Sequence, residues 1–200
     1  MDRSDVSRLH YIAAIANMPS IMELGILSHK RAARVPGHTS LANEQVQALR
    51  AGKRVPQGLM LHEYANLYFN ARNAMLFSLL DEHCDAMCVL GVDTDVLDLD
   101  DVVVTDGNAA VSWVTFKPAA EGLQHLDQEM IFRRYWTASN PIVQDRQRQA
   151  MQAEVLVPGV VPARFIHRAF VANNTARDAV RNAGFRPDCE IDRYMFFGRG

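Results

Sequence analysis

LHEYANLYFNARNAMLF, residues 61–77, is the stretch of this sequence that says most about the fold. Its seventeen residues include four aromatic side chains, three asparagines and one arginine. The apolar positions follow no clean 3.6-residue period, and residues 70–73 are of types that favour turns and helix caps. We therefore predict a strand over 67–70, then a loop, then a short helix that begins at about Ala74.

The end of this predicted strand has the residue types of a binding site for a planar, partly charged ligand. The rings of Tyr68 and Phe69 offer faces for stacking. Arg72 offers a planar fork of N–H groups for a phosphate or a carboxylate. An ordinary core strand followed by a surface loop explains the same residues equally well, so both interpretations stay open at this point.

The composition indicates a single folded domain over residues 1–200. Of the 200 residues, 48% are hydrophobic and 22% are charged, which is enough to bury a core. The sequence contains no stretch of transmembrane length and no signal-peptide core near its start, so we expect a cytoplasmic protein that does not contact the membrane. Cys84, Cys88 and Cys189 are a sparse set, and buried free thiols are favoured over half of a metal site.

The net charge of −2 conceals an uneven distribution. Residues 1–80 hold nine Lys or Arg against five Asp or Glu, residues 81–132 hold one against twelve, and residues 133–200 hold eleven against six. Eighteen of the 21 cations are arginine, which suits bidentate contacts to phosphate. Two basic ends that meet in the fold would form an anion-binding face with the acidic middle turned away. A solvated surface with internal ion pairs is the alternative.

Short strands alternate with turns and brief helices along the rest of the chain. One helix is predicted to begin at about Ser20, as its cap, and to stop at Gly25. Residues 28–58 are predicted as a long ordered loop that carries one short helix over 43–50. The other predicted helices are 74–84, 122–135 and 175–183, and the other predicted strands are 9–15, 86–92, 102–104, 153–158, 165–171 and 193–197. Residues 137–151 are polar, with Asn140-Pro141 as a breaker.

Glu154 is the strongest single candidate for a functional residue. An acid among apolar strand residues is costly to bury unless it has a task, although an edge-strand glutamate that faces water is the alternative. Arg50 closes the short helix in the basic loop and, on residue type alone, is a solvated cation. His10 is more often a core histidine than a catalyst. The sequence contains no glycine-rich phosphate loop, nucleophile elbow or metal-ligand cluster.

The order of the motifs resembles the DarT family, bacterial DNA ADP-ribosyltransferase toxins related to poly-ADP-ribose polymerases. HYIAAIANMPSIMELGILSH is similar to the opening motif of the family, and SLANEQVQALRAGKRVP is similar to its NAD-binding loop. LHEYANLYFNARNAMLF is similar to its most recognisable segment. RRYW followed by RQRQAMQAEVLVP is similar to its target-binding loop and catalytic glutamate. The resemblance covers nearly the whole chain, with the motifs in the right order.

The resemblance implies an α+β fold in which a split, strongly bent antiparallel sheet and flanking helices surround an NAD cleft. It implies an NAD-dependent enzyme with NAD as co-substrate and no metal. Glu154 would hydrogen-bond a ribose hydroxyl and gain strength as positive charge develops when nicotinamide leaves. Arg50 would orient the base and the NAD phosphates, because arginine is a poor base in water. On this basis Glu154→Ala is expected to abolish transfer and to leave the fold in place.

The NAD-binding residues that the resemblance implies come from three segments. They are Tyr11, Ile12 and Ala13 at the nicotinamide end, Ser20 and Ser28 along the dinucleotide, Arg50, and Tyr68 or Phe69 beside the nicotinamide. The family often carries a histidine where Tyr11 stands. His10 cannot simply replace that histidine, because neighbours on a strand point to opposite faces.

The same resemblance implies a single-stranded DNA target, with thymine or guanine as the modified base. Single strands need cations for phosphates and aromatic faces for bases, which here would come from Arg72, Tyr135, Trp136, Arg146 and Arg148. The expected function is that of a toxin that moves ADP-ribose from NAD onto DNA, with a macrodomain-type antitoxin as partner. The alternatives are an RNA or protein target and an inactive NAD- or nucleic-acid-binding module.

Overall fold

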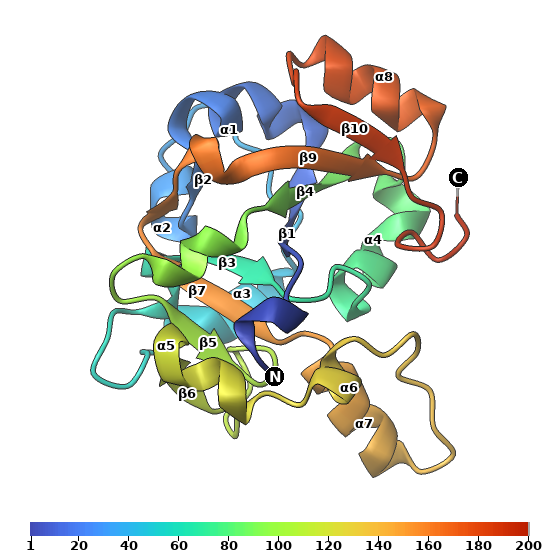
Figure 1. Ribbon diagram of the computed structural model, residues 1–200. Helices are drawn as coiled ribbons and strands as arrows, with labels where there is room; N and C mark the ends of the chain where they lie inside the picture. Colours follow the sequence, from blue (N-terminus) through green and yellow to red (C-terminus); the bar gives the residue numbers. More distant parts are fainter. Residues whose placement is uncertain (200) are drawn as a thin grey trace.

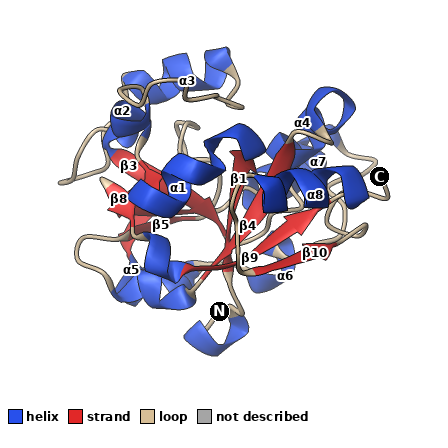
Figure 2. Ribbon diagram, turned by 90° about the horizontal axis from the view of Figure 1, so that it is seen from above, coloured by secondary structure: helices blue, strands red, loops and turns tan. Residues whose placement is uncertain are grey.

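An eight-stranded sheet forms the centre of the computed structural model, which describes residues 1–199 (Figures 1 and 2). Its strands are β1 (Leu9–Ala14), β3 (Tyr64–Tyr68), β4 (Met87–Val92), β5 (Val103–Thr105), β6 (Phe116–Pro118), β7 (Glu154–Pro158), β9 (Ile166–Val171) and β10 (Asp188–Ile191). The order is β10-β9-β4-β1-β3-β7-β5-β6, and β2 (Ile26–Leu27) pairs separately with β8 (Val160–Val161). Only β9 and β10 run parallel, so the sheet is mixed rather than purely antiparallel.

The sheet is split between β1 and β3. These two strands share a single pair of residues, His10 opposite Tyr68. By contrast, β1 pairs with β4 through six positions and β3 pairs with β7 through five. The four strands on each side therefore form two half-sheets that meet at one pair of residues.

Helices surround both half-sheets (Figure 1). Their bounds are α1 (Met18–Leu24), α2 (His29–Ala32), α3 (Glu44–Ala51), α4 (Ala74–His83), α5 (Ala119–Gly122), α6 (Gln128–Ile131), α7 (Pro141–Ala150) and α8 (Asn174–Asn182). Successive strand residues point to opposite faces of the sheet. Ala13 and Leu90 therefore enter the core that α8 covers, whereas Ile12 and Val89 enter a second core that α4 covers. Within residues 1–199, no helix is both long and apolar enough to cross a membrane.

Most of the predicted elements are confirmed. The strands expected over 9–15, 86–92 and 165–171 correspond to β1, β4 and β9, and the helices expected over 43–50, 74–84 and 175–183 correspond to α3, α4 and α8. Gly25 ends α1 with φ of 83°, a conformation that glycine adopts without strain. The strand expected over 67–70 lies earlier, over 64–68.

Three predicted elements were wrong. The helix expected over 122–135 is broken, because Leu126 and Asp127 are extended and the Asp127 side chain caps the new helix α6. Residues 137–151 contain the helix α7, in which Asn140 is the cap and Pro141 the first residue rather than a breaker. The strand expected over 193–197 is a series of turns, and the edge strand is the more polar β10.

Candidate active site

Glu154 is the first residue of β7, and its side chain has no exposed surface. Strand pairing holds its backbone, since Glu154 is opposite Tyr68 on β3 and the next residue, Val155, is opposite Val104 on β5. Its backbone N–H donates to Thr105 Oγ1 at 3.1 Å. The Thr105 hydroxyl in turn donates to the Gly107 carbonyl at 2.7 Å, which ties the following loop to the same point. The carboxylate is therefore buried on a rigid support.

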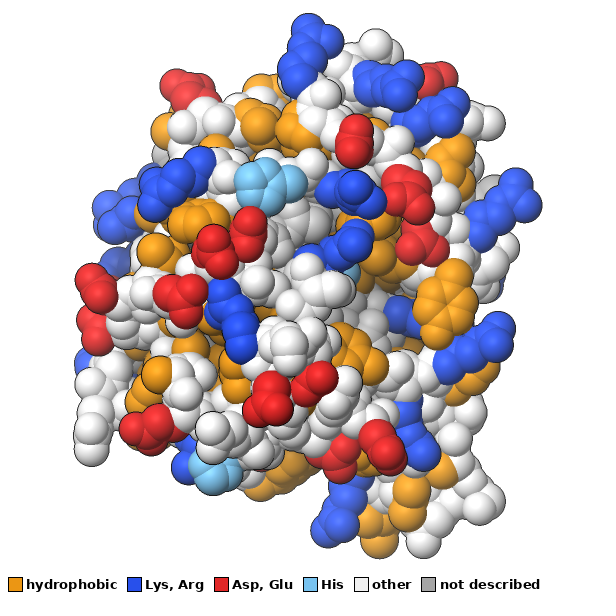
Figure 3. Space-filling model, in the orientation of Figure 1, with side chains coloured by type: hydrophobic (Ala, Val, Ile, Leu, Met, Phe, Trp, Pro, Cys, Tyr) orange, Lys and Arg blue, Asp and Glu red, His pale blue; other side chains and the backbone are white. Residues whose placement is uncertain are grey.

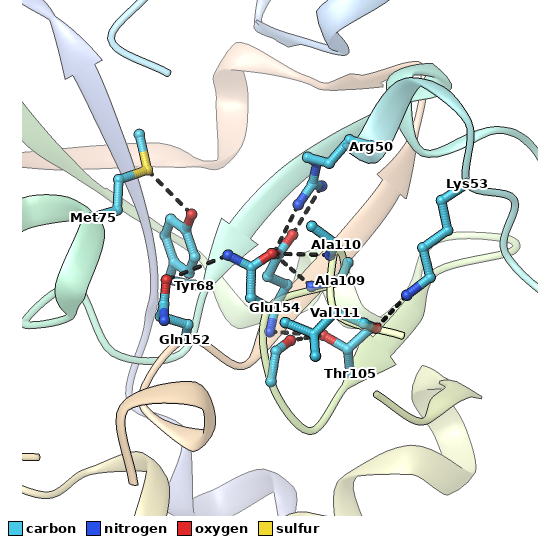
Figure 4. A network of polar contacts seen from close by, with 12 residues as sticks. Arg50, Lys53, Tyr68, Met75, Thr105, Ala109, Ala110, Val111, Gln152 and Glu154 are labelled. Atoms are coloured by element: carbon cyan, nitrogen blue, oxygen red, sulfur yellow. Dashed lines mark hydrogen bonds and ion pairs between the residues drawn. The ribbon is translucent and has the colours of Figure 1, made fainter. Parts of the chain in front are cut away.

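Arg50 makes a bidentate ion pair with this carboxylate (Figure 4). Its Nη1 lies 2.9 Å from Glu154 Oε1 and its Nη2 lies 3.0 Å from Oε2. The Ala109 backbone N–H donates a further hydrogen bond of 3.0 Å to Oε1. Three of the about four acceptor positions of the carboxylate are thus occupied, and the remaining one is on Oε2.

The helix α3 positions Arg50 in its last turn. The Asn43 side chain caps the start of this helix by accepting from the N–H groups of Gln45 and Val46. Arg50 is only 5% exposed. Burial alone would lower the pKa of its guanidinium, but the Glu154 charge and hydrogen bonds outweigh burial and raise it. Arg50 therefore stays charged and cannot serve as a proton acceptor.

The loop 106–115 holds the Ala109 N–H in place. Lys53, three residues after Arg50, donates from its Nζ to the Val111 carbonyl (Figure 4). Burial, and then the nearby Arg50 charge, lower the pKa of Lys53. The loop also packs against the end of α7, since a Cβ at Gly107 would lie 3.2 Å from the Gln149 carbonyl oxygen. The helix α3 thus supplies the cation of the ion pair, and Lys53, two residues after the end of α3, anchors the loop.

A cavity of about 570 Å³ opens beside this ion pair, at the split of the sheet. Of the residues expected to bind NAD, Tyr11, Ile12, Ala13, Arg50 and Tyr68 line it. Burial raises the pKa of Tyr11 to about 12. Burial and then the Glu154 charge raise the pKa of Tyr68, whose hydroxyl donates to Met75 Sδ at 3.2 Å. Both phenols are therefore neutral at physiological pH.

Three other expected NAD contacts lie elsewhere in the structure. Phe69 is completely buried in the core on the far side of the strand from Tyr68. Ser20 lies inside α1 and donates to the Asn17 carbonyl, while Ser28 is 1% exposed beneath the surface. The structure does not bring these three side chains to the cavity wall.

His10 also lies outside the cavity wall, whereas Tyr11 forms part of it. The Nδ1 of His10 lies 3.1 Å from the Phe69 carbonyl oxygen, to which its neutral ring can donate. Burial, and then the charge of Arg8, lower the pKa of His10 to about 4. The tyrosine, not the neighbouring histidine, is the side chain available to a ligand.

Sequence reasoning missed three histidines that line the cavity, His29, His38 and His62. The rings of His29 and His62 lie 4.1 Å apart although 32 residues separate them in the chain. Burial is the first cause that lowers the pKa of each of the three. Their spacing in the sequence has no regular pattern, so only the fold shows that they are neighbours.

Arg72 is a structural residue rather than a free cation. It is 6% exposed, its Nε donates to the Arg134 carbonyl at 3.0 Å, and its Nη1 donates to the Tyr194 carbonyl. Its guanidinium carbon lies 3.8 Å from the centre of the Phe197 ring. Arg72 therefore ties the end of the chain to the segment around Arg134, and it is not the exposed phosphate contact that the sequence suggested.

The other residues expected to bind DNA are at or near the surface. Tyr135 is 50% exposed, and Trp136 packs edge-on against Phe77 with ring centres 5.7 Å apart. Arg146 and Arg148 are exposed on α7, and Arg148 also lines the cavity. Arg148 Nη2 lies 2.7 Å from an oxygen of Asp145. Figure 3 shows Lys and Arg side chains distributed over the visible face of the molecule and interspersed with acidic side chains.

The acidic middle of the sequence is not all turned away from the site. Its loop 106–115, which contains a single acidic residue, supplies Asn108, Ala110 and Val111 to the cavity wall. The charge pattern therefore predicted only part of the arrangement, because one loop of the acidic segment lies at the cavity.

Comparison with known proteins agrees with this geometry. Residues 10–197 match the family described as "ssDNA thymidine ADP-ribosyltransferase, DarT". A DNA ADP-ribosyl transferase–DNA ADP-ribosyl glycohydrolase fusion protein of Thermosipho africanus is 29% identical over 180 residues, which are 88% of this chain and 45% of the fusion. The chain thus spans about half the length of that relative.

Two solved structures of DarT from Thermus sp. 2.9 share the fold. One, in complex with ADP-ribosylated single-stranded DNA, has a TM-score of 0.82 and 24% identity over 96% of this chain and 97% of its own. The other, in complex with NAD+, has a TM-score of 0.76 and 25% identity over 96% of this chain and 98% of its own. The expected ADP-ribosyltransferase fold is confirmed, and the chain belongs to the DarT family of single-stranded DNA thymidine ADP-ribosyltransferases.

Proposed function

We propose that this protein transfers ADP-ribose from NAD to a base of single-stranded DNA and releases nicotinamide. The observation that carries the proposal is the buried Arg50–Glu154 pair beside a cavity of about 570 Å³ at the split of the sheet. This volume suits a cofactor-sized ligand. Membership of the DarT family supports thymine as the modified base. The relative solved with NAD+ supports NAD as the co-substrate.

We place the nicotinamide end of NAD against Tyr11 and Tyr68. Both side chains line the cavity, and both hydroxyls remain protonated because burial raises their pKa values. Neutral rings offer nicotinamide stacking faces without a competing charge. The three histidines of the cavity wall provide polar groups that contact the rest of the dinucleotide.

Glu154 then acts on charge that appears only in the transition state. The bond between the nicotinamide nitrogen and the ribose carbon breaks, nicotinamide keeps the electron pair, and the ribose gains oxocarbenium character. The remaining acceptor position on Glu154 Oε2 takes a ribose hydroxyl, so the carboxylate stabilises the developing charge. Because Glu154 has no exposed surface, this contact requires neighbouring side chains to shift.

A ring nitrogen of the base bonds to the ribose carbon and gives up its proton. Arg50 does not accept this proton, because its guanidinium stays charged. We assign proton acceptance to the Oε2 atom of the Glu154 carboxylate, which releases the ribose hydroxyl once the new bond has removed the charge on the ribose. Arg50 holds that carboxylate in place and orients the phosphates and the base.

Single-stranded DNA fits the arginines on the cavity rim. Arg148 lines the cavity itself, and Arg146, two residues earlier on α7, is exposed. Tyr135 and Trp136, which follow α6 in the chain, add aromatic surface. A strand bound here would be held by phosphate neutralisation and by base stacking.

We further propose that an ADP-ribosyl glycohydrolase of macrodomain type is the natural partner and reverses the modification, with the protein acting as the toxin of the pair. The Thermosipho africanus relative, in which a DNA ADP-ribosyl transferase and a DNA ADP-ribosyl glycohydrolase are fused, supports this pairing. The reaction requires NAD and DNA in one compartment, so we place the enzyme in the cytoplasm.

The test is incubation of the purified protein with NAD and one nucleic acid at a time, followed by mass spectrometry and by assay of free nicotinamide. The nucleic acids are a single-stranded DNA with all four bases, the same DNA as a duplex, and an RNA of the same sequence. We expect the mass of one ADP-ribose to be added to the single-stranded DNA, on thymine, with nicotinamide released in equal amount. Modification of RNA alone, or NAD consumption with every nucleic acid unchanged, would contradict the proposal.

A further inference from the structure

A second hollow, of about 560 Å³, lies outside the main cavity and is lined by Trp113, Pro141, Ile142, Asp145 and Arg146. Neither the ion pair nor the NAD site uses it. Its walls are the loop 106–115 and the first half of α7. Figure 3 shows hydrophobic side chains uncovered at the lower right, in the region of α7.

The apolar walls of this hollow are unusually exposed. Trp113 is 55% exposed and Ile142 is 68% exposed, although both are residue types that normally gain by burial. The Trp113 ring stacks on no other aromatic or arginine side chain among residues 1–199. A planar apolar face is therefore left available in a hollow large enough for a nucleobase.

The charges of the hollow favour an anionic occupant. Arg146 makes no ion pair with any residue that the structure describes. The only acid in the lining, Asp145, accepts a hydrogen bond of 2.7 Å from Arg148, so its charge is offset. An apolar face beside an unpaired arginine is the combination that binds a base together with its phosphate.

Both walls of the hollow continue into the main cavity. On the loop, Val111 lines the main cavity and Trp113, two residues later, lines the hollow. On α7, Arg146 lines the hollow and Gln149, three residues later, lines the main cavity, a rise of about 4.5 Å along the helix. A strand whose target base enters the main cavity would therefore bring its neighbouring nucleotide to the hollow.

The loop that carries Trp113 is held in a fixed position. Its Ala109 N–H donates to Glu154, its Val111 carbonyl accepts from Lys53, and its Thr115 N–H donates to Asp106 at 2.8 Å. A stacking platform on such a loop is pre-organised, so little ordering cost opposes binding. The same contacts link the position of Trp113 to that of the catalytic carboxylate.

We propose that Trp113, with Ile142 and Arg146, forms a subsite that binds the nucleotide next to the modified base. The inference rests on the proposed function and adds to it a specific contact for the flanking nucleotide. Trp113 stacks on the flanking base, Ile142 packs against it, and Arg146 contacts its phosphate. The subsite gives the enzyme its register on the strand, because one base is held while its neighbour is delivered to the cavity.

The first test measures binding of a single-stranded DNA of about eight nucleotides, a length within the range that such sites cover. Trp113→Ala should weaken binding about 5- to 150-fold, because stacking of one base is lost, while Trp113→Phe should retain most of the affinity. Quenching of tryptophan fluorescence on binding should be larger in the wild type than in Trp113→Phe, which keeps only Trp136. Leu24→Ala is the matched control, since Leu24 is 45% exposed on α1 and lines neither cavity.

The second test removes the base instead of the side chain. An oligonucleotide with an abasic position beside the target should bind the wild type more weakly than the intact oligonucleotide does. Trp113→Ala should bind both oligonucleotides equally, because the lost interaction is the same one. If Trp113→Ala weakens binding relative to the wild type by the same factor on intact and on abasic DNA, the subsite is refuted. Wild-type affinity of Trp113→Ala for intact DNA also refutes it.

Two further outcomes are distinguishable. A wild type that neither binds nor modifies single-stranded DNA refutes the proposed function itself, not only the subsite. A Trp113→Ala variant with normal DNA binding that no longer binds a glycohydrolase partner assigns the hollow to protein docking and refutes the nucleotide proposal.

Discussion

Replacing Arg50 with methionine should destabilise the fold, not only the reaction. The variant would leave the Glu154 carboxylate buried, with the backbone N–H of Ala109 as its remaining hydrogen-bond donor. Breaking a buried ion pair by removing one partner costs about 3–5 kcal/mol, because a charge stays buried without compensation. Since domains of this size are typically stable by about 5–15 kcal/mol, the loss is a large fraction of the total.

The double variant Arg50→Met/Glu154→Gln should recover much of this loss. It removes both charges, and replacing a whole buried pair is often close to neutral. Its glutamine oxygen can still accept the Ala109 N–H. We expect it to be more stable than Arg50→Met by about 2 kcal/mol, although it has two substitutions rather than one.

The assay is urea unfolding followed by circular dichroism, with the slope against urea checked for constancy among variants. Arg146→Met is the matched control, because Arg146 is exposed and makes no ion pair with a described residue, so its change should stay within about 0.5 kcal/mol. If Arg50→Met lowers the free energy of unfolding no more than this control does, the Arg50–Glu154 pair is not a buried pair whose members depend on each other. The same follows if the double variant is destabilised as much as Arg50→Met. The same reasoning changes the expectation for Glu154→Ala, which would leave the Arg50 charge buried without its partner and so should also destabilise the fold.

Three further outcomes are expected. When the pH falls from 7.5 to 5, His10 should lower the free energy of unfolding by about 2 kcal/mol. The pKa of His10 is about 4 in the fold, below its ordinary value of 6.5, so the unfolded chain takes up the proton first. The urea midpoints of the wild type and of His10→Asn should therefore approach each other at pH 5. Lys53→Met, which releases the Val111 carbonyl, should lower kcat about tenfold or more with little change in KM for NAD, and Lys53→Arg should restore part of it. Arg146→Ala and Arg148→Ala together should reduce the dependence of log affinity for single-stranded DNA on log salt by about 1.4, at about 0.7 per phosphate contact, as a salt titration would show.

The half-sheets and their main helices could be predicted from sequence because their signals are local. Apolar runs over 86–92 and 165–171 predict strands, and Asn43, a residue type that caps helices, stands ahead of Val46 and Leu49 at helical spacing. Asn140-Pro141 carried an equally good local signal, a cap followed by proline at the first helical position. It was interpreted as a breaker because the helix it opens is polar and has a weak apolar face.

The candidate site was harder to predict, because its contacts span long distances in the chain. The sequence indicates Glu154 and Arg50 as separate candidates. No local sequence pattern predicts that these two residues, 104 positions apart, form a bidentate pair. The N–H of Ala109 has no sequence signature at all, since any non-proline residue supplies one. Arg72 shows the opposite error, because its residue type suits phosphate while the fold uses it to bind carbonyls of the segments around Arg134 and Tyr194.

The most direct test of the central claim is the rate of ADP-ribose transfer to single-stranded DNA by Glu154→Gln compared with the wild type. Both proteins should be measured at NAD concentrations that saturate them, with NAD binding and folding checked independently. If Glu154 stabilises the developing ribose charge, the variant should bind NAD about as well as the wild type and transfer ADP-ribose at least about 100-fold more slowly. A folded, NAD-saturated Glu154→Gln variant that modifies DNA at nearly the wild-type rate would contradict the account.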